Sequence, residues 1–177
     1  MISRETDAGR IGEKPLNLFR LFVYGTLKRG YWNHDRLCRD SVSITEATVR
    51  GQLYELPSGI PVLAVEDEDV LAQGTGDPLA DTVTQCEIDA GISVETGHRI
   101  GDVPRLVRGE LVTFDDPARH IPPIDRLEGF FPGRSSLYVR VLVPVVTSSE
   151  DIVAAWCYVF PSKSLSGVTP LTGDSWP

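Results

Sequence analysis

The sequence feature that most constrains the fold is an apolar stretch that runs into a loop bounded by glycines. Residues 19–24 are rich in strand-forming types and are interrupted only by Arg20. The stretch breaks at Gly25, and a second glycine, Gly30, precedes a polar segment at 33–40 that is compatible with a helix. A strand that ends in such a loop before a helix presents several backbone N–H groups in one direction, which suits a carboxylate, a phosphate or a developing oxyanion.

Taken alone, the loop leaves two interpretations open. Glycine pairs between a strand and a helix are common, so an ordinary strand–turn–helix junction explains the pattern as well as an anion site does. The spacing excludes two known phosphate motifs, because GxxxxGK[ST] fails at Tyr31 and Trp32 and GxGxxG is absent. Since Gly25 has no Cβ, a ligand or another backbone segment can approach it closely.

Length, composition and charge limit the classes of protein. The 177 residues, 41% hydrophobic and 24% charged, fit one globular domain whose core needs neither disulfides nor metal. The net charge of −8 argues against nucleic acid or an anionic membrane as a partner. The three cysteines and three histidines show no CxxC, HxxxH or HExxH spacing, so we expect no metal site. Without an apolar run of membrane length or a secretory signal at the N-terminus, a cytoplasmic location is expected.

The order of apolar and polar segments predicts an α+β fold, with a small mixed β-barrel or sheet and a few flanking helices. We predict a flexible leader at 1–16, one domain at 17–161 and a flexible tail at 162–177 that packs little. One short helix follows Asn33, and another, with Pro122 and Pro123 in its first turn, ends near Glu128. Strands are predicted at 19–24, 48–56, 60–65, 106–114, 137–146 and 152–160.

Residues 66–104 differ from the rest of the domain. The segment is acidic and polar, contains scattered glycines and has no Phe, Trp or Tyr. We interpret it as an insertion between core strands, with local strands around Ile88 and residues 92–94. A solvated surface excursion is the simplest interpretation, and a lid or an oligomer contact are the alternatives.

Five segments in order give the chain a family resemblance. Residues 23–30 (VYGTLKRG), followed by Asn33 and His34, resemble the YG[ST]LxxG signature of the gamma-glutamylcyclotransferase-like (avirulence-induced-gene-like) family. The other segments are 50–54 (RGQLY, resembling GxLY and followed by Pro61), 107–111 (VRGEL, resembling GEL), 124–130 (IDRLEGF, resembling LDxxEGY) and 138–140 (YVR, resembling YxR). Phe130 departs from the family pattern, which commonly has tyrosine there, and the 66–104 segment has no counterpart in compact members.

The resemblance implies cyclisation of a γ-glutamyl amino acid or γ-glutamylamine to 5-oxoproline with release of the amine. It assigns the role of general acid and base to Glu128, and implies no metal and no organic cofactor. It places substrate-binding residues in the glycine loop and in one later strand: Tyr24, Gly25, Thr26, Leu27 and Tyr138. The implied partner is a small γ-glutamyl molecule.

Glu128 needs a shifted pKa for this role. A free glutamate titrates near ~4.3, which is too acidic for ready return of a proton to a leaving nitrogen. The neighbouring Leu127, Phe130 and Phe131 are expected to desolvate the carboxyl group and raise its pKa. We expect Asp125 to cap or pair near the helix, and Arg140 to pair with an acidic residue.

Two other functions remain compatible with the sequence. The first is a non-catalytic small-molecule binding or interaction module that shares the fold, because fold does not fix function. The second is a different reaction on the γ-glutamyl group, which the same residues would serve.

Overall fold

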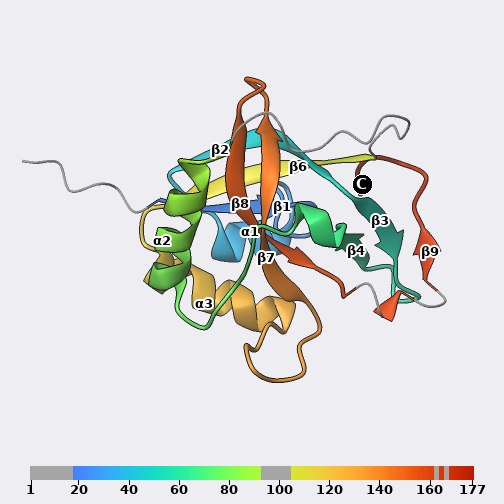
Figure 1. Ribbon diagram of the computed structural model, residues 1–177. Coiled ribbons are helices and arrows are strands. Elements are labelled where there is room, and N and C mark those ends of the chain that lie inside the picture. The colour runs from blue at the N-terminus through green and yellow to red at the C-terminus, as the bar shows by residue number, and fades with distance from the viewer. Residues whose placement is uncertain (1–17, 93–104, 162–163, 166–167) are drawn as a thin grey trace, which may run out of the picture.

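Five strands close into a barrel at the centre of the protein (Figure 1), described by a computed structural model for residues 18–92, 105–161, 164–165 and 168–177. Going round the barrel, β2 is followed by β6, β1, β8 and β7, and β7 pairs back with β2. Neighbouring strands run antiparallel except β1 and β8, which are parallel. The barrel strands are β1 (Phe19–Val23), β2 (Ser43–Arg50), β6 (Leu106–Phe114), β7 (Val139–Thr147) and β8 (Ile152–Val159).

A second, three-stranded sheet lies to one side of the barrel. It contains β3 (Gln52–Glu55), β4 (Pro61–Ala64) and β9 (Thr169–Pro170), in the order β4-β3-β9. The predicted single strand at 48–56 is therefore two strands, and the chain leaves the barrel at Gly51. A Cβ atom at this position would lie 2.6 Å from the Ala64 carbonyl oxygen, so only glycine permits this close approach.

The helices cover the other side of the barrel. They are α1 (Trp32–Leu37), α2 (Pro78–Asp89) and α3 (Pro117–Glu128), and α2 and α3 pack against each other. The 3-10 turn η1 (Asp67–Asp69) and the two-residue strand β5 (Ala72–Gln73), on the edge of β7, precede α2. The predicted α+β fold, a small barrel with flanking helices, is confirmed.

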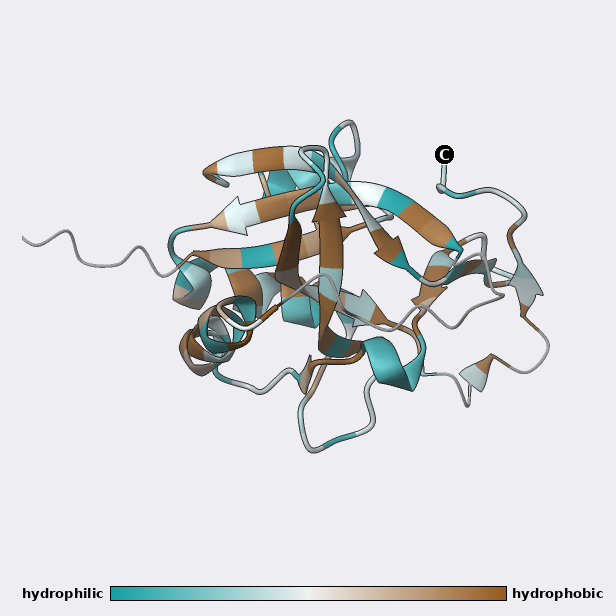
Figure 2. Cartoon of the chain, turned by 45° about the horizontal axis from the view of Figure 1, so that its top comes forward, coloured by the Kyte–Doolittle hydropathy of each residue, from teal (hydrophilic) through white to brown (hydrophobic). Residues whose placement is uncertain are grey.

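Two layers of apolar side chains hold these elements together, and the barrel strands in Figure 2 are correspondingly hydrophobic. One layer draws on all five barrel strands and fills the barrel, with Phe22, Val49, Leu111, Val143 and Cys157 among its members. The other lies between the barrel and the helices and includes Phe19, Val112, Ile121, Ile124 and Trp156.

The predicted strand around Ile88 is wrong, because Ile88 lies in helix α2. The buried residues of this helix are Pro78, Asp81, Thr82 and Gln85, whereas Leu79 and Val83 are exposed. The face that packs on the protein is thus largely polar, which reverses the usual amphipathic pattern. Residues 93–94, also expected to be extended, lie outside the described part of the chain.

Helix α3 begins earlier than predicted. It starts at Pro117, where the Asp116 side chain accepts a hydrogen bond from the Arg119 backbone N–H, and Pro122 and Pro123 lie inside it rather than in its first turn. Proline removes a helical hydrogen bond, so the burial of side chains such as Ile121 has to hold the middle of the helix.

The prediction that the residues after 161 pack little is wrong for residues 168–177. Strand β9 pairs with β3, and the Leu171 N–H donates to the Leu53 carbonyl oxygen at 2.9 Å. Trp176 stacks on Tyr31 with ring centroids 5.4 Å apart. The open edge of β3 supplies backbone partners for this segment, a possibility that composition alone does not reveal. The predicted leader, 1–16, lies outside the described residues.

Candidate active site

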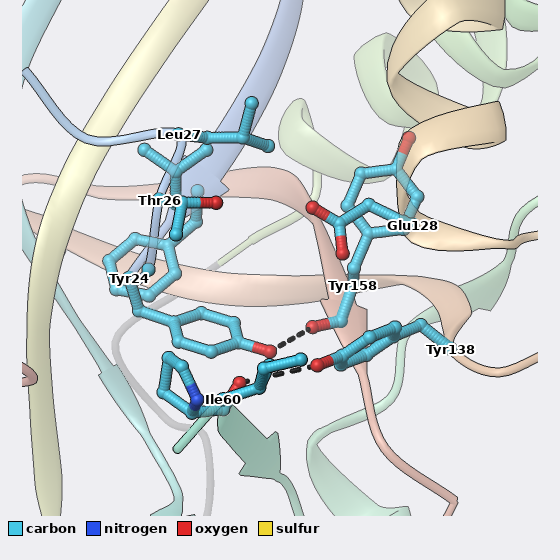
Figure 3. Close-up of a pocket in the computed structure, with 11 residues that line it drawn as sticks. Tyr24, Thr26, Leu27, Ile60, Glu128, Tyr138 and Tyr158 are labelled. Carbon is cyan, nitrogen blue, oxygen red and sulfur yellow. Dashed lines mark hydrogen bonds between the residues drawn. The ribbon is translucent and has the colours of Figure 1, made fainter. Parts of the chain in front are cut away.

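A pocket opens where the parallel strands β1 and β8 end, between the start of β4 and the last turn of α3 (Figure 3). The loop that follows β1 forms one side of it, and Glu128 faces that loop from the other side. The lining residues are Phe22, Val23, Tyr24, Gly25, Thr26, Leu27, Ile60, Pro61, Glu128, Tyr138 and Tyr158.

The loop after β1 carries backbone donors that no described residue uses. Within the described part of the chain, the N–H groups of Gly25, Thr26 and Leu27 donate to no other residue. The turn itself is closed by the Lys28 N–H, which donates to the Gly25 carbonyl oxygen at 3.0 Å. Three consecutive unused N–H groups beside a pocket are suited to binding carboxylate or oxyanion oxygens.

Helix α1 holds this loop in place through two side chains. Asn33 Nδ2 donates to Thr26 Oγ1 at 2.9 Å, and the buried His34 contacts the Leu27 carbonyl oxygen through Nδ1 at 2.8 Å. Because a carbonyl oxygen only accepts, His34 Nδ1 must carry the proton. Both residues belong to the predicted signature, and the structure gives them a tethering role.

Replacing His34 with leucine is expected to lower the free energy of unfolding by about 1–3 kcal/mol, because the Leu27 carbonyl oxygen loses its buried partner. Urea denaturation measures the loss of stability, and amide exchange should become faster at Lys28, whose N–H closes the turn on the Gly25 carbonyl oxygen. Asn33→Ala is the matched control, since it removes an exposed tether and should cost less than about 1 kcal/mol. Equal losses in the two variants would contradict the tethering role of His34.

Two tyrosine hydroxyls in the pocket form hydrogen bonds with backbone groups. Tyr24 donates to the Tyr158 carbonyl oxygen at 2.9 Å and accepts from the Leu63 N–H at 3.2 Å. Tyr138 donates to the Pro61 carbonyl oxygen at 3.2 Å. Burial raises the pKa of both phenols well above the usual tyrosine range, so they stay neutral. They form walls and fix the distance between β1, β4 and β8.

Glu128 is the last residue of α3 and lies on its buried face. It follows Ile121 by seven residues and Ile124 by four, so it continues the stripe that packs on the barrel. Gly129 then ends the helix with φ +63°, a left-handed conformation that glycine adopts easily. The carboxyl group is thereby directed into the pocket (Figure 3).

Burial raises the pKa of Glu128 to about 7, and the negative charge of Asp125 adds to the rise. Of the three neighbouring side chains that were expected to desolvate Glu128, only one is buried. Phe130 is buried, but Leu127 and Phe131 are 37% and 46% exposed and point away from the core. The aromatic walls of the pocket replace them, because Glu128 is enclosed with Tyr24, Tyr138 and Tyr158.

Asp125 and Arg140, each of which was expected to pair, form an ion pair with each other. Arg140 Nη1 donates to Asp125 Oδ1 at 2.9 Å, and the Tyr158 hydroxyl donates to the same oxygen at 2.6 Å. Burial raises the pKa of Asp125, while the guanidinium of Arg140 opposes the rise. Since its acceptor oxygens are occupied, Asp125 is not placed to serve as the base.

The sequence match agrees with this geometry. The family described as "Gamma-glutamyl cyclotransferase, AIG2-like" matches residues 21–77 and 96–177, which include every residue that lines the pocket. The chain belongs to this family. The resemblance found in the sequence is confirmed.

Similar proteins include one curated relative and several solved structures. The relative, "Putative gamma-glutamylcyclotransferase MJ1514" of Methanocaldococcus jannaschii, is 23% identical over 154 residues, which cover 87% of this chain and 92% of that protein. YkqA from Bacillus subtilis matches with 20% identity and a TM-score of 0.49, over 90% of this chain but only 39% of that chain. An aig2-like protein from Mus musculus matches with 16% identity and a TM-score of 0.49, over 90% of this chain and 88% of that one.

In this member of the family, the six predicted site residues lie together in one pocket. The sequence did not point to Tyr158 or Ile60. Tyr158 reaches the site only because β8 lies parallel to β1, and no local pattern signals that pairing. A signal for Glu128 is present in the chain itself, since a glutamate at helical spacing from Ile121 and Ile124 is unusual on a buried face.

In the ranges that the structure describes, no group of three His, Cys, Asp or Glu side chains is arranged to hold a metal ion. No helix in those ranges is both long and apolar enough to cross a membrane.

Proposed function

We propose that this protein cyclises a γ-glutamyl amino acid or γ-glutamylamine to 5-oxoproline and releases the amine, with Glu128 as general acid and base. The observation that carries the proposal is a single carboxyl group, with its pKa raised to about 7, facing a loop of unused backbone N–H groups in one pocket. Family membership supports the same reaction class.

The chemistry needs one proton carrier. The Glu128 carboxylate takes a proton from the α-ammonium group of the substrate, and the freed nitrogen attacks the γ-carbonyl carbon. A new C–N bond forms and the carbonyl oxygen becomes an oxyanion. When the oxyanion collapses, the bond to the leaving nitrogen breaks, and Glu128 returns the proton to that nitrogen. The ring nitrogen then loses its second proton to the released amine, which leaves a neutral lactam and an ammonium ion. A carboxyl group with a pKa near neutral pH can do both steps.

The remaining demands are geometric. Nucleophile and electrophile belong to one molecule, so folding the substrate into a ring-like shape supplies much of the acceleration. The N–H groups of Gly25, Thr26 and Leu27 are the proposed donors to substrate oxygens, while Tyr24 and Tyr138 are the proposed walls. Gly25 leaves room for this approach, because a Cβ atom there would lie 3.3 Å from Pro61 Cγ.

The direct test is release of 5-oxoproline from γ-glutamyl dipeptides, γ-glutamyl-ε-lysine and glutathione. An N-acetyl-γ-glutamyl compound is the matched control, since its blocked nitrogen cannot cyclise but its γ-amide can still be hydrolysed. Release from the free compounds alone is the expected result. Release of glutamate instead of 5-oxoproline would point to hydrolysis, and saturable binding without any product would identify a non-catalytic binding module.

A further inference from the structure

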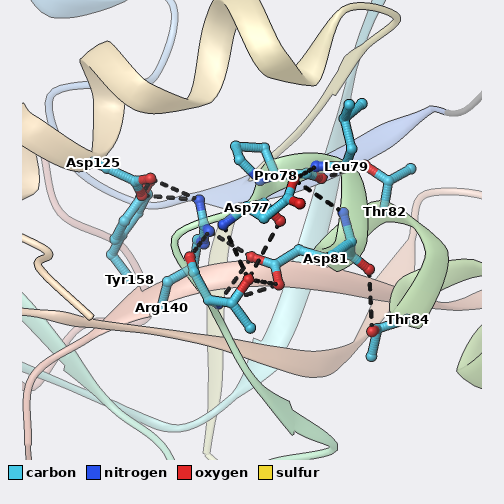
Figure 4. A network of polar contacts seen from close by, with 11 residues as sticks. Asp77, Pro78, Leu79, Asp81, Thr82, Thr84, Asp125, Arg140 and Tyr158 are labelled. Atoms are coloured by element: carbon cyan, nitrogen blue, oxygen red, sulfur yellow. Dashed lines mark hydrogen bonds and ion pairs between the residues drawn. The ribbon is translucent and has the colours of Figure 1, made fainter. Parts of the chain in front are cut away.

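A group of charged residues lies between strand β7 and the helices α2 and α3, in contact with the pocket residue Tyr158 (Figure 4). Its centre is Arg140 of β7, whose side chain is 0% exposed. Arg140 Nη2 pairs with Asp81 of α2 at 2.5 Å, and Nη1 pairs with Asp125 of α3 at 2.9 Å. Arg140 Nη2 also donates to the Thr75 carbonyl oxygen at 2.8 Å.

This group contacts the proposed site on two sides. Asp125 precedes Glu128 by three residues in the last turn of α3, so its position fixes that of the helix end. Tyr158 lines the pocket, and its hydroxyl donates to Asp125 at 2.6 Å. Any displacement of Arg140 is therefore transmitted to Glu128 through α3 and to the pocket wall through Tyr158.

Asp81 comes from a part of the chain that the family match does not include. The match stops at residue 77 and resumes at 96, whereas α2 spans Pro78–Asp89. The Asp81 side chain is only 1% exposed, and its carboxylate accepts from both the N–H and the hydroxyl of Thr75. Burying a carboxylate costs free energy unless a cation pairs with it, so Asp81 requires Arg140 as its partner.

If Asp81 were removed, Arg140 Nη2 would have no other carboxylate close by to pair with in the described part of the chain. Its guanidinium carbon lies 5.6, 5.0 and 5.7 Å from the ring centroids of Phe19, Phe130 and Trp156. These rings accept the cation over their faces but offer no hydrogen-bond acceptor to the η nitrogens. The orientation of the guanidinium group therefore depends on its ion pairs with both Asp81 and Asp125.

We propose that Asp81 is a positioning residue for the reaction at Glu128: it holds one side of the Arg140 fork, and so sets the place of Asp125, of Tyr158 and of the end of α3. The inference rests on the proposed function, because it assigns a role in that reaction to a helix outside the family match. Asp81 itself does not touch the substrate.

The test compares wild type with Asp81→Asn, which keeps the shape and removes the charge. We expect kcat to fall at least about tenfold, because small displacements of catalytic groups are costly. Carboxyl NMR of labelled Glu128 should show a lower titration midpoint, since Arg140 then neutralises Asp125 more fully. Three titratable side chains line the pocket with Glu128, namely Tyr24, Tyr138 and Tyr158, and burial keeps their phenols neutral. The charge of Asp125 raises the pKa of Glu128, and the buried thiols of Cys38 and Cys157 stay neutral.

Asp77→Ala is the matched control on the same helix. Asp77 caps α2 by accepting from the Leu79 and Ala80 N–H groups and does not contact Arg140. It should lower Tm but leave kcat and the Glu128 midpoint unchanged. Wild-type kcat and midpoint in folded Asp81→Asn would overturn the proposal, as would equal changes in the two variants.

A milder variant keeps the test decisive if Asp81→Asn does not fold. Thr75→Val removes the hydroxyl that donates to Asp81 at 2.8 Å and leaves the charges in place. A fall of a few fold in kcat at unchanged KM supports the proposal, and wild-type kcat overturns it. If wild type turns over no γ-glutamyl compound, the proposed function fails, and the Glu128 midpoint alone then decides whether Asp81 positions this carboxyl group.

Discussion

Glu128→Gln is expected to lower turnover of the γ-glutamyl substrate by a factor of about 10² to 10⁴, the usual range for loss of a general acid–base group. Glutamine keeps the size of the side chain but cannot carry a proton between the two nitrogens. In wild type, kcat/KM should rise with pH through about 7, because the ionised carboxylate is the form that accepts the proton. Release of 5-oxoproline between pH 5 and 9 measures both effects, and equal turnover by the two proteins would remove Glu128 from the mechanism.

The same substitution should make the protein more stable at alkaline pH. Folded Glu128 keeps its proton up to pH about 7, whereas the unfolded chain releases it near pH 4.5. The folded state therefore binds more protons between these values, so wild type loses stability as pH rises through this window. Glu128→Gln does not undergo this loss and should be more stable than wild type by roughly 3 kcal/mol at pH 8.5.

Chemical denaturation at pH 4 and pH 8.5 separates this effect from a general change in stability. At pH 4 the carboxyl group is protonated in both states, so the two proteins should differ little. Glu87→Gln is the matched control, because Glu87 is exposed on α2. Parallel stability curves for Glu128→Gln and wild type across this range would show that Glu128 is not desolvated.

Arg140→Met is expected to destabilise the fold by about 3–5 kcal/mol, the usual cost of breaking a buried ion pair on one side. Methionine fills much of the arginine volume among the aromatic rings but leaves the carboxylates of Asp81 and Asp125 without a cation. Thermal and urea unfolding measure the loss. Arg119→Met is the matched control, since it breaks the exposed Arg119–Asp40 pair and should cost no more than about 1 kcal/mol.

The loss in Arg140→Met should shrink in acid. Burial already raises the pKa of Asp125 and Arg140 opposes that rise, so removing Arg140 raises the pKa further. The variant then binds a proton on folding, and its stability recovers as pH falls. A loss that is the same at pH 5 and pH 8 would mean that the packing of the arginine, and not its charge, stabilises the fold.

The parts of the fold that were predicted from the sequence are those with local signals. Apolar alternation and β-branched residues predict a strand at 106–114, and β6 has these bounds. The loop after β1 and the residue Glu128 followed from the family signature. Their meeting in one pocket needed the three-dimensional arrangement, which a single sequence does not display.

The predictions that were wrong, for helix α2 and for residues 168–177, failed for physical reasons. Helix α2 buries Asp81 and Gln85 and exposes Leu79 and Val83, so a reading that expects an apolar inner face cannot detect it. The buried face is polar because its partners are polar: Arg140 for Asp81, and the backbone of Leu18 and Arg20 for the Gln85 amide. The packing of residues 168–177 depends on the edge of β3, which lies more than a hundred residues earlier.

The parallel pairing of β1 with β8 has a consequence for how the protein is made. The loop at 24–27 leaves the ribosome early, but Tyr24 binds a carbonyl oxygen 134 residues further on. Contacts of such long sequence separation close late, because the chain between them must first lose its freedom. A nascent or prematurely terminated chain without β8 thus carries the signature loop but lacks one wall of the pocket, so the proposed site is complete only after β8 has been made.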